Sequence, residues 1–423
     1  MRVMQPRVLL FSTTTGYQLR SFNDAAERLG IELIFATDRC QELDDPWRDR
    51  AIAVRFHDEA KSLEDVVGGG PFHGVLAVGD RPTILAAQAA ERLGLQGNPP
   101  HAAAASGNKL ETRARLGAAG LAVPAYFTMP ASEPGWRAAS DPRVEFPCVL
   151  KPLGLSGSRG VIRADSPSGF ARAFDRIRAL LSRVDVRAGR SGLDRMILAE
   201  RFIEGREVAV EGVLTAGALQ VFTIFDKPDP LDGPFFEETI YLTPTSLDVA
   251  TRDELVSAIQ QATDAIGLWH GPIHAECRIG PAGIYVLEVA ARPIGGLCSK
   301  ALRFQSDESL EQVLLRHAIG EDITSVTRER AASAVMMIPI PRQGRLKRVD
   351  GEAAALDVQH VEAVQITAKI GQALEVLPES GSYLGFIFAR ADTAAEADAA
   401  VRAAHARLSF TIDSRIAIAH AEG

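Results

Sequence analysis

The sequence is poor in cysteine, and its four cysteines form no metal-binding or redox motif. They are Cys40, Cys148, Cys277 and Cys298, with no CxxC pair and no zinc-type spacing. Isolated cysteines of this kind are ordinarily buried, reduced thiols in a cytosolic protein. We therefore expect a cytoplasmic location.

Long hydrophobic runs and basic clusters are also missing. No apolar segment approaches the roughly 20 residues that span a membrane, and the apolar run in "MRVMQPRVLLFSTTTGYQ" is too short for a signal peptide. The formal net charge is -8 and no long Lys/Arg run occurs, which argues against nucleic acid or an anionic membrane as partner. We expect small-molecule partners instead.

Strand and helix signals alternate in the first hundred residues. Apolar runs such as "RVLLFS", "IELIFAT" and "GVLAVGD" alternate with helical patterns such as "RPTILAAQAAERLG". This alternation predicts βαβ units with a parallel sheet. Gly16 and Gly79 follow strands, where such sheets often bind ligands, although loop geometry explains both glycines equally well. The glycine fingerprint of an NAD-dependent oxidoreductase is missing.

From residue 146 the pattern becomes antiparallel α+β, and it begins with a glycine-rich loop. The stretch "VLKPLGLSGSRGV" holds Gly154, Gly157 and Gly160 behind Lys151. Backbone N–H groups of such loops can cradle phosphates, with a strand lysine adding charge. The loop lacks GK[ST] and is followed by a strand, so it is neither a P-loop nor a dinucleotide fingerprint. A flexible hairpin is the alternative interpretation.

Two later strands, "GPIHAECRIG" and "GIYVLEVAAR", predict a hairpin joined at "PAG". A three-residue loop at 281–283, with glycine in the left-handed region, is a common hairpin connection. In that register Gly280 pairs with Ile284, and Glu276 lies directly opposite Glu288. Their Cβ atoms are then expected about 5 Å apart.

Two facing carboxylates in an apolar sheet require either a shared proton or a cation. Oxygen ligands alone favour Mg²⁺ over zinc or copper. Arg292 lies on the same face and adds an anion-binding group. The pattern therefore indicates metal plus phosphate, unless both glutamates lie on a solvated face.

The order of these motifs resembles that of the ATP-grasp ligases over roughly residues 5–340. The corresponding segments are "SGNKLETRARLGAAGLAVP", "FPCVLKP", "GLSGSRGV", "ILAERFIEGREVAVEG", "IHAECRI" and "YVLEVAARPIGG". The resemblance implies an α/β and α+β fold of three parts. They are an N-terminal βαβ domain at 1–105, a two-lobed ATP-grasp domain at 106–325 (small lobe about 140–210, metal-binding lobe about 211–325) and a C-terminal α+β lobe at 326–423.

The resemblance also implies the residues of the site. In the family the glutamate matched by Glu200 bonds the adenine amino group, and the one matched by Glu207 lies at the ribose. The backbone at Phe202 and Ile203 would follow the base edge. The implied ATP-binding set is Lys109, Lys151, Gly154, Ser156, Gly157, Ser158, Gly160, Glu200, Phe202, Ile203 and Glu207. One or two Mg²⁺ ions, or Mn²⁺ in their place, would bind Glu276 and Glu288. The implied catalytic set around an acyl phosphate is Arg292, Gly295 and Gly296.

The sequence departs from the family pattern at Ala290, where many members have an asparagine that binds metal. This departure puts a second Mg²⁺ in doubt, although some amide-forming members also carry alanine there. In the predicted hairpin His274 lies opposite Ala290. It either helps to fill the gap near the substrate or is simply a packed, hydrogen-bonded histidine.

One loop resembles the dipeptide-forming branch of the family, that of bacterial L-amino-acid ligases and carnosine synthase. The loop is "FDKPDPLDGPFFEETIYLTP". In or beside it, Asp226, Glu237 and Glu238 would bind the α-ammonium of an amino-acid substrate, or are merely solvated acids.

The resemblance implies an ATP-dependent ligase that joins a carboxylate to an amine, each from an amino acid, through an acyl phosphate. ADP and phosphate are released. Two alternatives stay open: a biotin carboxylase-like or formate-dependent enzyme, and a non-catalytic nucleotide-binding protein. Relatives are often dimers, so a homodimer is compatible with the resemblance. The general base is unassigned; a glutamate of 237–238 and the phosphate itself are candidates.

Overall fold

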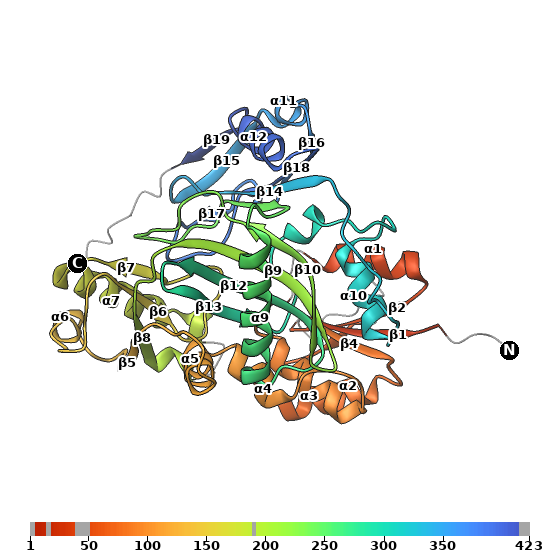
Figure 1. Cartoon of the computed structure of the whole chain (residues 1–423), viewed down its shortest axis with the longest axis horizontal. Helices are drawn as coiled ribbons and strands as arrows, with labels where there is room; N and C mark the ends of the chain where they lie inside the picture. The colour runs from red at the N-terminus through yellow and green to blue at the C-terminus, as the bar shows by residue number, and fades with distance from the viewer. Residues whose placement is uncertain (1–4, 14–17, 39–50, 188–191, 414–423) are drawn as a thin grey trace, which may run out of the picture.

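A computed structural model of the chain describes residues 5–13, 18–38, 51–187 and 192–413 (Figure 1). Gly16 and Cys40 lie outside these ranges, so the expectations for them stay predictions. Cys148, Cys277 and Cys298 are buried free thiols, as expected. Among the described helices, none is long and apolar enough to cross a membrane.

The N-terminal part is a parallel sheet with the strand order β3-β2-β1-β4, as the alternating pattern predicts. Apolar residues of the strands are buried against the helices between them, since parallel strands need such crossovers. The strands are β1 (Arg7–Ser12), β2 (Glu32–Thr37), β3 (Ile52–Ala53) and β4 (Gly74–Val78). The helices are α1 (Leu19–Leu29), α2 (Glu59–Gly68) and α3 (Thr83–Leu93), and α4 (Pro100–Ser106) and α5 (Lys109–Ala118) follow.

A small antiparallel sheet with the order β5-β8-β6-β7 follows and lies at the left of Figure 1. Helix α7 (Pro167–Leu181) covers it with Phe170, Phe174 and Ile177, which are fully buried. The strands are β5 (Tyr126–Pro130), β6 (Cys148–Pro152), β7 (Ile162–Ala164) and β8 (Met196–Arg201). Short helices are α6 (Gly135–Ala138), α8 (Val184–Arg187) and η1 (Leu193–Arg195).

The largest sheet has eight strands in the order β13-β12-β9-β10-β11-β14-β18-β16. It continues across residue 326, so strands of the C-terminal part extend the sheet that carries the acidic hairpin. Its strands are β9 (Arg206–Thr215), β10 (Ala218–Asp226), β11 (Ile240–Thr243), β12 (Gly271–Gly280), β13 (Gly283–Ala290), β14 (Ala332–Ile338), β16 (Val361–Ile366) and β18 (Gly385–Ala391).

Helices and a three-stranded sheet, β17-β15-β19, complete the fold around this sheet. The helices are α9 (Val249–Ile266), η2 (Cys298–Ala301), α10 (Leu310–Ala318), α11 (Glu352–Leu356) and α12 (Ala394–His405). The strands are β15 (Gly344–Asp350), β17 (Ala373–Leu374) and β19 (Ser409–Asp413).

The turn of the acidic hairpin differs from the prediction. Gly280 pairs with Gly283, not with Ile284, so the tight turn holds only Pro281 and Ala282. Gly283 does adopt the expected positive φ, at 110°. The pairing near the turn was therefore predicted one residue too far along β13.

A β-bulge restores the predicted pairing at the two glutamates. Cys277 pairs with Val286, but Glu276 pairs with Glu288, so Leu287 is the extra residue of the bulge. The two glutamates are thus direct cross-strand neighbours, as predicted.

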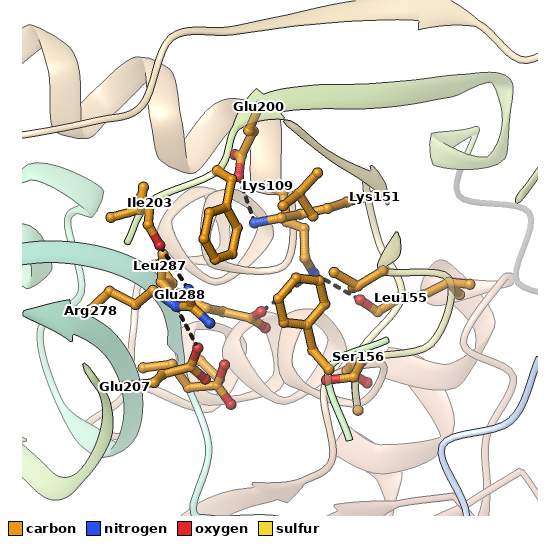
Figure 2. A pocket seen from close by; sticks show the side chains of 18 of the residues that line it. Lys109, Lys151, Leu155, Ser156, Glu200, Ile203, Glu207, Arg278, Leu287 and Glu288 are labelled. Carbon is orange, nitrogen blue, oxygen red and sulfur yellow. Dashed lines mark hydrogen bonds and ion pairs between the residues drawn. The ribbon is translucent and has the colours of Figure 1, made fainter. Parts of the chain in front are cut away.

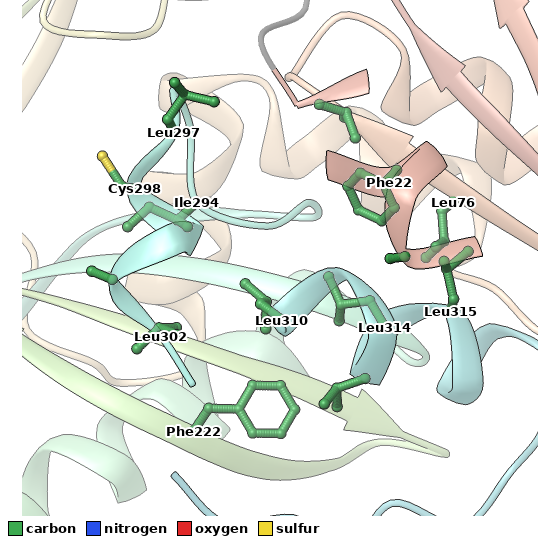
Figure 3. Close-up of a cluster of buried hydrophobic side chains, with 14 of the residues drawn as sticks. Phe22, Leu76, Phe222, Ile294, Leu297, Cys298, Leu302, Leu310, Leu314 and Leu315 are labelled. Carbon is green, nitrogen blue, oxygen red and sulfur yellow. The ribbon is translucent and has the colours of Figure 1, made fainter. Parts of the chain in front are cut away.

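A buried apolar cluster joins the N-terminal part to the large sheet (Figure 3). Phe22 of α1 and Leu76 of β4 belong to the same cluster as Phe222 of β10 and Leu314 of α10. Ile294 and Leu297, in the loop after β13, also belong to it. Burial of these side chains fixes the loop that carries Arg292 against both parts of the molecule.

Candidate active site

A pocket opens between the small sheet and the acidic hairpin (Figure 2). Thirteen residues predicted from the sequence line it: Lys109, Lys151, Ser156, Gly157, Ser158, Glu200, Phe202, Ile203, Glu207, His274, Glu276, Glu288 and Arg292. Seven predicted residues do not: Gly154, Gly160, Asp226, Glu237, Glu238, Gly295 and Gly296. Segments from five regions of the chain therefore meet at one cavity.

Lys151 lies against a buried carboxylate. Its Nζ is 2.5 Å from Glu200 Oε2, and Arg113 Nε donates to Glu200 Oε1 at 2.7 Å. Burial raises the pKa of Glu200, but the charges of Arg113 and Lys151 outweigh it and lower that pKa to about 2. Both Glu200 oxygens are thus occupied by cations, and its contact with adenine stays a prediction.

Arg113 is a residue of this site that the motif search missed. It is completely buried, and its Nη1 donates to Leu287 O at 2.8 Å. It therefore links α5 to the bulge beside Glu288. Its position four residues after Lys109 puts both on one face of a helix, which is the signal that could have identified it.

The other predicted lysine, Lys109, connects the glycine loop to the hairpin. Lys109 Nζ donates to Leu155 O at 2.8 Å and lies 3.4 Å from Glu288 Oε2. In the glycine loop, Gly157 and Ser158 have positive φ of 62° and 55°. Glycine adopts this conformation at no steric cost, which suits position 157. The loop thus curves around the pocket beside Lys109.

Aromatic and aliphatic side chains close the other end of the pocket. Phe202 and Phe236 are stacked with ring centroids 6.4 Å apart. Arg278 donates to Ile203 O at 2.7 Å and to Glu207 Oε2 at 3.0 Å. Phe236 belongs to the loop that was predicted to bind the amino acid, so part of that loop also encloses the apolar end of this pocket.

A buried lysine lies among three carboxylates beside the hairpin. Oxygens of Glu207, Glu238 and Glu276 lie within 4.8 Å of one another. Lys227 Nζ is 2.8 Å from Glu207, bonds Glu238, and is 3.6 Å from Glu276. Burial and the neighbouring Glu276 raise the pKa of Glu238 to about 7, although Lys227 opposes this. Lys227 was missed by sequence reasoning and would be found only from its place beside Asp226.

Arg292 is held by the N-terminal part of the chain. Its Nε and Nη2 donate to the two oxygens of Asp80 at 2.8 and 3.2 Å. Asp80 follows Gly79, the glycine noted after β4, which has a φ of 83°. Burial lowers the pKa of Arg292, but Asp80 outweighs it and raises that pKa above its usual value.

His274 lies opposite Ala290, as predicted. Its Nδ1 is 3.1 Å from Glu211 Oε2 and its Nε2 is 3.8 Å from Glu276 Oε1. Burial lowers the pKa of His274, but hydrogen bonds to the two glutamates raise it to about 9. Glu211, which the motif search missed, also accepts a hydrogen bond from Ile294 N at 3.0 Å. His274 is thus a hydrogen-bonded histidine that lines the pocket.

Asp226, one of the predicted ammonium-binding acids, is bonded by neighbouring residues of the chain. It accepts hydrogen bonds from Thr245 Oγ1 at 2.5 Å and Ser246 N at 2.8 Å, and it pairs with Arg206. The carboxylate is buried and outside the pocket. Its oxygens are thus bonded within the fold near the end of β10, and a contact of Asp226 with a substrate ammonium stays a prediction.

The charge of Glu200 should contribute to stability in a pH-dependent way. Because its folded pKa is depressed, its contribution is present above the unfolded pKa, near 4.5, and is lost as pH falls toward about 2. We expect Glu200→Gln to lower the unfolding free energy at pH 7 by on the order of 3 kcal/mol. Urea unfolding from pH 7 to pH 3 should show this difference shrinking below about pH 4.5.

The matched control for this measurement is Glu111→Gln, which removes only a surface pair with Arg115 on α5. It should change stability by less than about 1 kcal/mol at every pH. A Glu200→Gln difference that does not vary with pH would contradict the assignment of a stabilised charge to Glu200.

Three family models match the chain in order. They describe an ATP-grasp N-terminal domain at residues 23–97, an ATP-grasp domain at 144–301 and an L-amino acid ligase C-terminal domain at 336–413. The crystal structure of an L-amino acid ligase from Bacillus licheniformis is similar over 97% of this chain and 99% of its own, with 26% identity and a TM-score of 0.81.

Two curated relatives are similar to the chain over most of its length. Uncharacterized protein y4rH of Sinorhizobium fredii is 24% identical over 96% of this chain and 83% of its own length. Alanine–anticapsin ligase of Bacillus subtilis is 28% identical over 64% of this chain and 60% of its own length. Since a ligase-type C-terminal domain follows the ATP-grasp domain and the whole chain shares its fold with an L-amino acid ligase, the protein is an ATP-grasp carboxylate–amine ligase, an enzyme that forms C–N bonds.

Proposed function

We propose that this ligase condenses two amino acids, using ATP to convert the carboxylate of one into an acyl phosphate. The observation that carries the proposal is the similarity of residues 336–413 to the C-terminal domain of L-amino acid ligases. The name of alanine–anticapsin ligase describes a condensation of the same class. A chain built for bicarbonate or formate would not be expected to share that C-terminal domain.

We assign the phosphates of ATP to the end of the pocket that holds Lys109 and Lys151. The backbone of the glycine loop, with Gly154, Ser156, Gly157, Ser158 and Gly160, would surround them. The base would lie against the apolar end of the pocket that Phe202 and Phe236 line. The edge of the base would then meet the backbone at Phe202 and Ile203, and the ribose would lie beside Glu207. Positioning of this kind supplies much of the rate of phosphoryl transfer.

We assign a divalent metal to Glu276 and Glu288, because a cross-strand pair of carboxylates offers only the oxygen ligands that Mg²⁺ prefers. Both face the pocket. Lys227, 3.6 Å from Glu276, and Lys109, 3.4 Å from Glu288, supply the remaining positive charge. When bound, Mg²⁺ or Mn²⁺ would neutralise charge on the transferred phosphoryl group. Ala290 offers no ligand atom, so one ion fits better than two.

In the first step a carboxylate oxygen of the substrate attacks the γ-phosphorus. The new O–P bond forms as the bond to the β-phosphate oxygen breaks, and ADP leaves. The charge on the oxygens of the transferred phosphoryl group is stabilised by Lys109, Lys151 and Arg292. Closure of the glycine loop excludes water that would hydrolyse the acyl phosphate.

In the second step the amine nitrogen of the other amino acid attacks the acyl carbon and phosphate leaves. Arg292 and the amides of Gly295 and Gly296 would stabilise the tetrahedral oxyanion. Before it attacks, the amine must lose a proton. We assign the protonated amine of this substrate to the side of the site where Glu237 and Glu238 lie. Glu238, with a pKa near 7, suits a group that accepts that proton.

The proposal is tested by phosphate release from ATP with Mg²⁺, screened against all pairs of the twenty L-amino acids. Bicarbonate and formate are included as separate acids. We expect release that requires two amino acids, with the condensed product found by mass spectrometry. Release with bicarbonate or formate alone would move the activity to the carboxyphosphate or formyl-phosphate class. ATP binding without release in any well would overturn the condensation of two standard amino acids, and would point to another acid or amine or to a site disabled at Ala290.

A further inference from the structure

A segment of the C-terminal part lies directly on the glycine loop. This strap, residues 375–381 ("EVLPESG"), connects β17 to β18. Gly160 N donates to Pro378 O at 2.8 Å, and Arg159 Nε donates to Glu379 O at 2.8 Å. The backbone of the strap is therefore hydrogen-bonded to the loop that we assign to the phosphates of ATP.

Side-chain ion pairs hold the same strap to the small lobe. Glu379 accepts two hydrogen bonds from Arg176 of α7, at 2.5 Å from Nε and 2.7 Å from Nη2. Glu375 accepts one from Arg183 Nη1 at 3.0 Å. A bidentate arginine–carboxylate pair has the geometry that makes a surface ion pair effective. The strap is thus attached on both sides of its contact with the glycine loop.

The strap also approaches the loop more closely than a side chain would allow. A Cβ on Gly381 would lie 2.7 Å from the carbonyl oxygen of Gly157. Gly157 lines the pocket. The φ of Gly381 is not in the left-handed region, so alanine at that position would meet the loop without backbone strain of its own. Gly381→Ala is therefore a direct way to separate the two segments.

We propose that the strap is a latch for the glycine loop and that Glu379 is its main positioning residue. Nucleotide can enter and leave only when the loop opens, and opening breaks the contacts with Pro378, Glu379 and Gly381. The latch thereby lengthens the time for which the acyl phosphate is shielded from water. This inference rests on the proposed nucleotide site and adds a role for the C-terminal part in holding that site closed.

The test uses Glu379→Ala and Gly381→Ala in the full chain. Release of a fluorescent ADP analogue, measured by stopped flow, should accelerate about two- to fivefold in Glu379→Ala, as expected for loss of one effective surface ion pair. It should also accelerate in Gly381→Ala, because the added Cβ pushes the strap away from the glycine loop. The amount of ADP formed per amide product should rise, because an earlier opening lets water reach the acyl phosphate. The double variant Arg176→Glu/Glu379→Arg reverses the ion pair. It should restore both the rate of ADP release and the amount of ADP formed per amide product.

The matched control is Glu362→Ala. Glu362 joins Arg303 at 2.9 Å, with its side chain 32% exposed against 31% for Glu379, and it does not contact the glycine loop. This control should leave ADP release and coupling unchanged. Unchanged release in both strap variants, with normal nucleotide binding by the wild type, would overturn the latch. Failure of the wild type to bind ADP would instead overturn the proposed nucleotide site.

Discussion

Replacing Glu276 or Glu288 by glutamine is expected to abolish ADP formation while the protein stays folded. Both carboxylates face the pocket from adjacent positions of the hairpin. Glutamine keeps their shape but is a much poorer ligand for a divalent cation. Since such a cation contributes several kcal/mol to the stabilisation of transferred phosphoryl charge, we expect a loss of roughly a thousandfold in kcat.

The loss should not arise from unfolding. The side chains of Glu276 and Glu288 are 26% and 25% exposed, so solvent screens their interactions with the neighbouring lysines. We expect each Gln variant to change the free energy of unfolding by at most about 2 kcal/mol. Glu362→Gln, at a carboxylate of similar exposure outside the pocket, is the control for both measurements. Near-normal ADP formation together with a large fall in Tm would show that the pair is structural.

The hairpin illustrates how far the sequence alone reaches. The cross-strand pairing of Glu276 with Glu288 was predicted correctly. The prediction rested on a turn that pairs Gly280 with Ile284, whereas Gly280 pairs with Gly283 in the structure. The structure has a tighter turn and compensates with a bulge at Leu287. A bulge is not visible in the alternation of polar and apolar residues, because it arises from packing of neighbouring strands. Here Arg113 bonds the carbonyl of Leu287, and nothing in the hairpin sequence indicates that contact.

Two of the residues that sequence reasoning missed, Asp80 and Lys227, bind charged groups that lie far from them in the sequence. Asp80 binds an arginine 212 positions away. Lys227 gathers three glutamates from β9, β12 and the loop before β11. Motif order identifies the groups that would contact nucleotide. It does not reveal the charges that neutralise those groups, because those charges depend on how the domains meet.

Arg292→Lys should lower kcat by about a hundredfold or more, with a smaller change in the KM for ATP. Lysine keeps the positive charge but lacks the planar fork that donates to both oxygens of Asp80. Its ammonium would not be held where charge develops on the phosphoryl and acyl oxygens, and the loss of one such donor costs about 10²–10³ in kcat. Steady-state kinetics with the amino-acid pair found in the screen would measure both values.

Asp80→Asn separates two roles of Arg292, its ion pair with Asp80 and its proposed contact with the transition state. This variant keeps the guanidinium and removes only the charge that anchors it. If Arg292 contacts the transition state, Asp80→Asn should cost about tenfold in kcat, well short of the loss in Arg292→Lys, because the arginine is still present but less fixed. Equal losses in the two variants would mean that the ion pair itself is what catalysis requires. Near-normal kcat in Arg292→Lys would show that a positive charge alone suffices at this position.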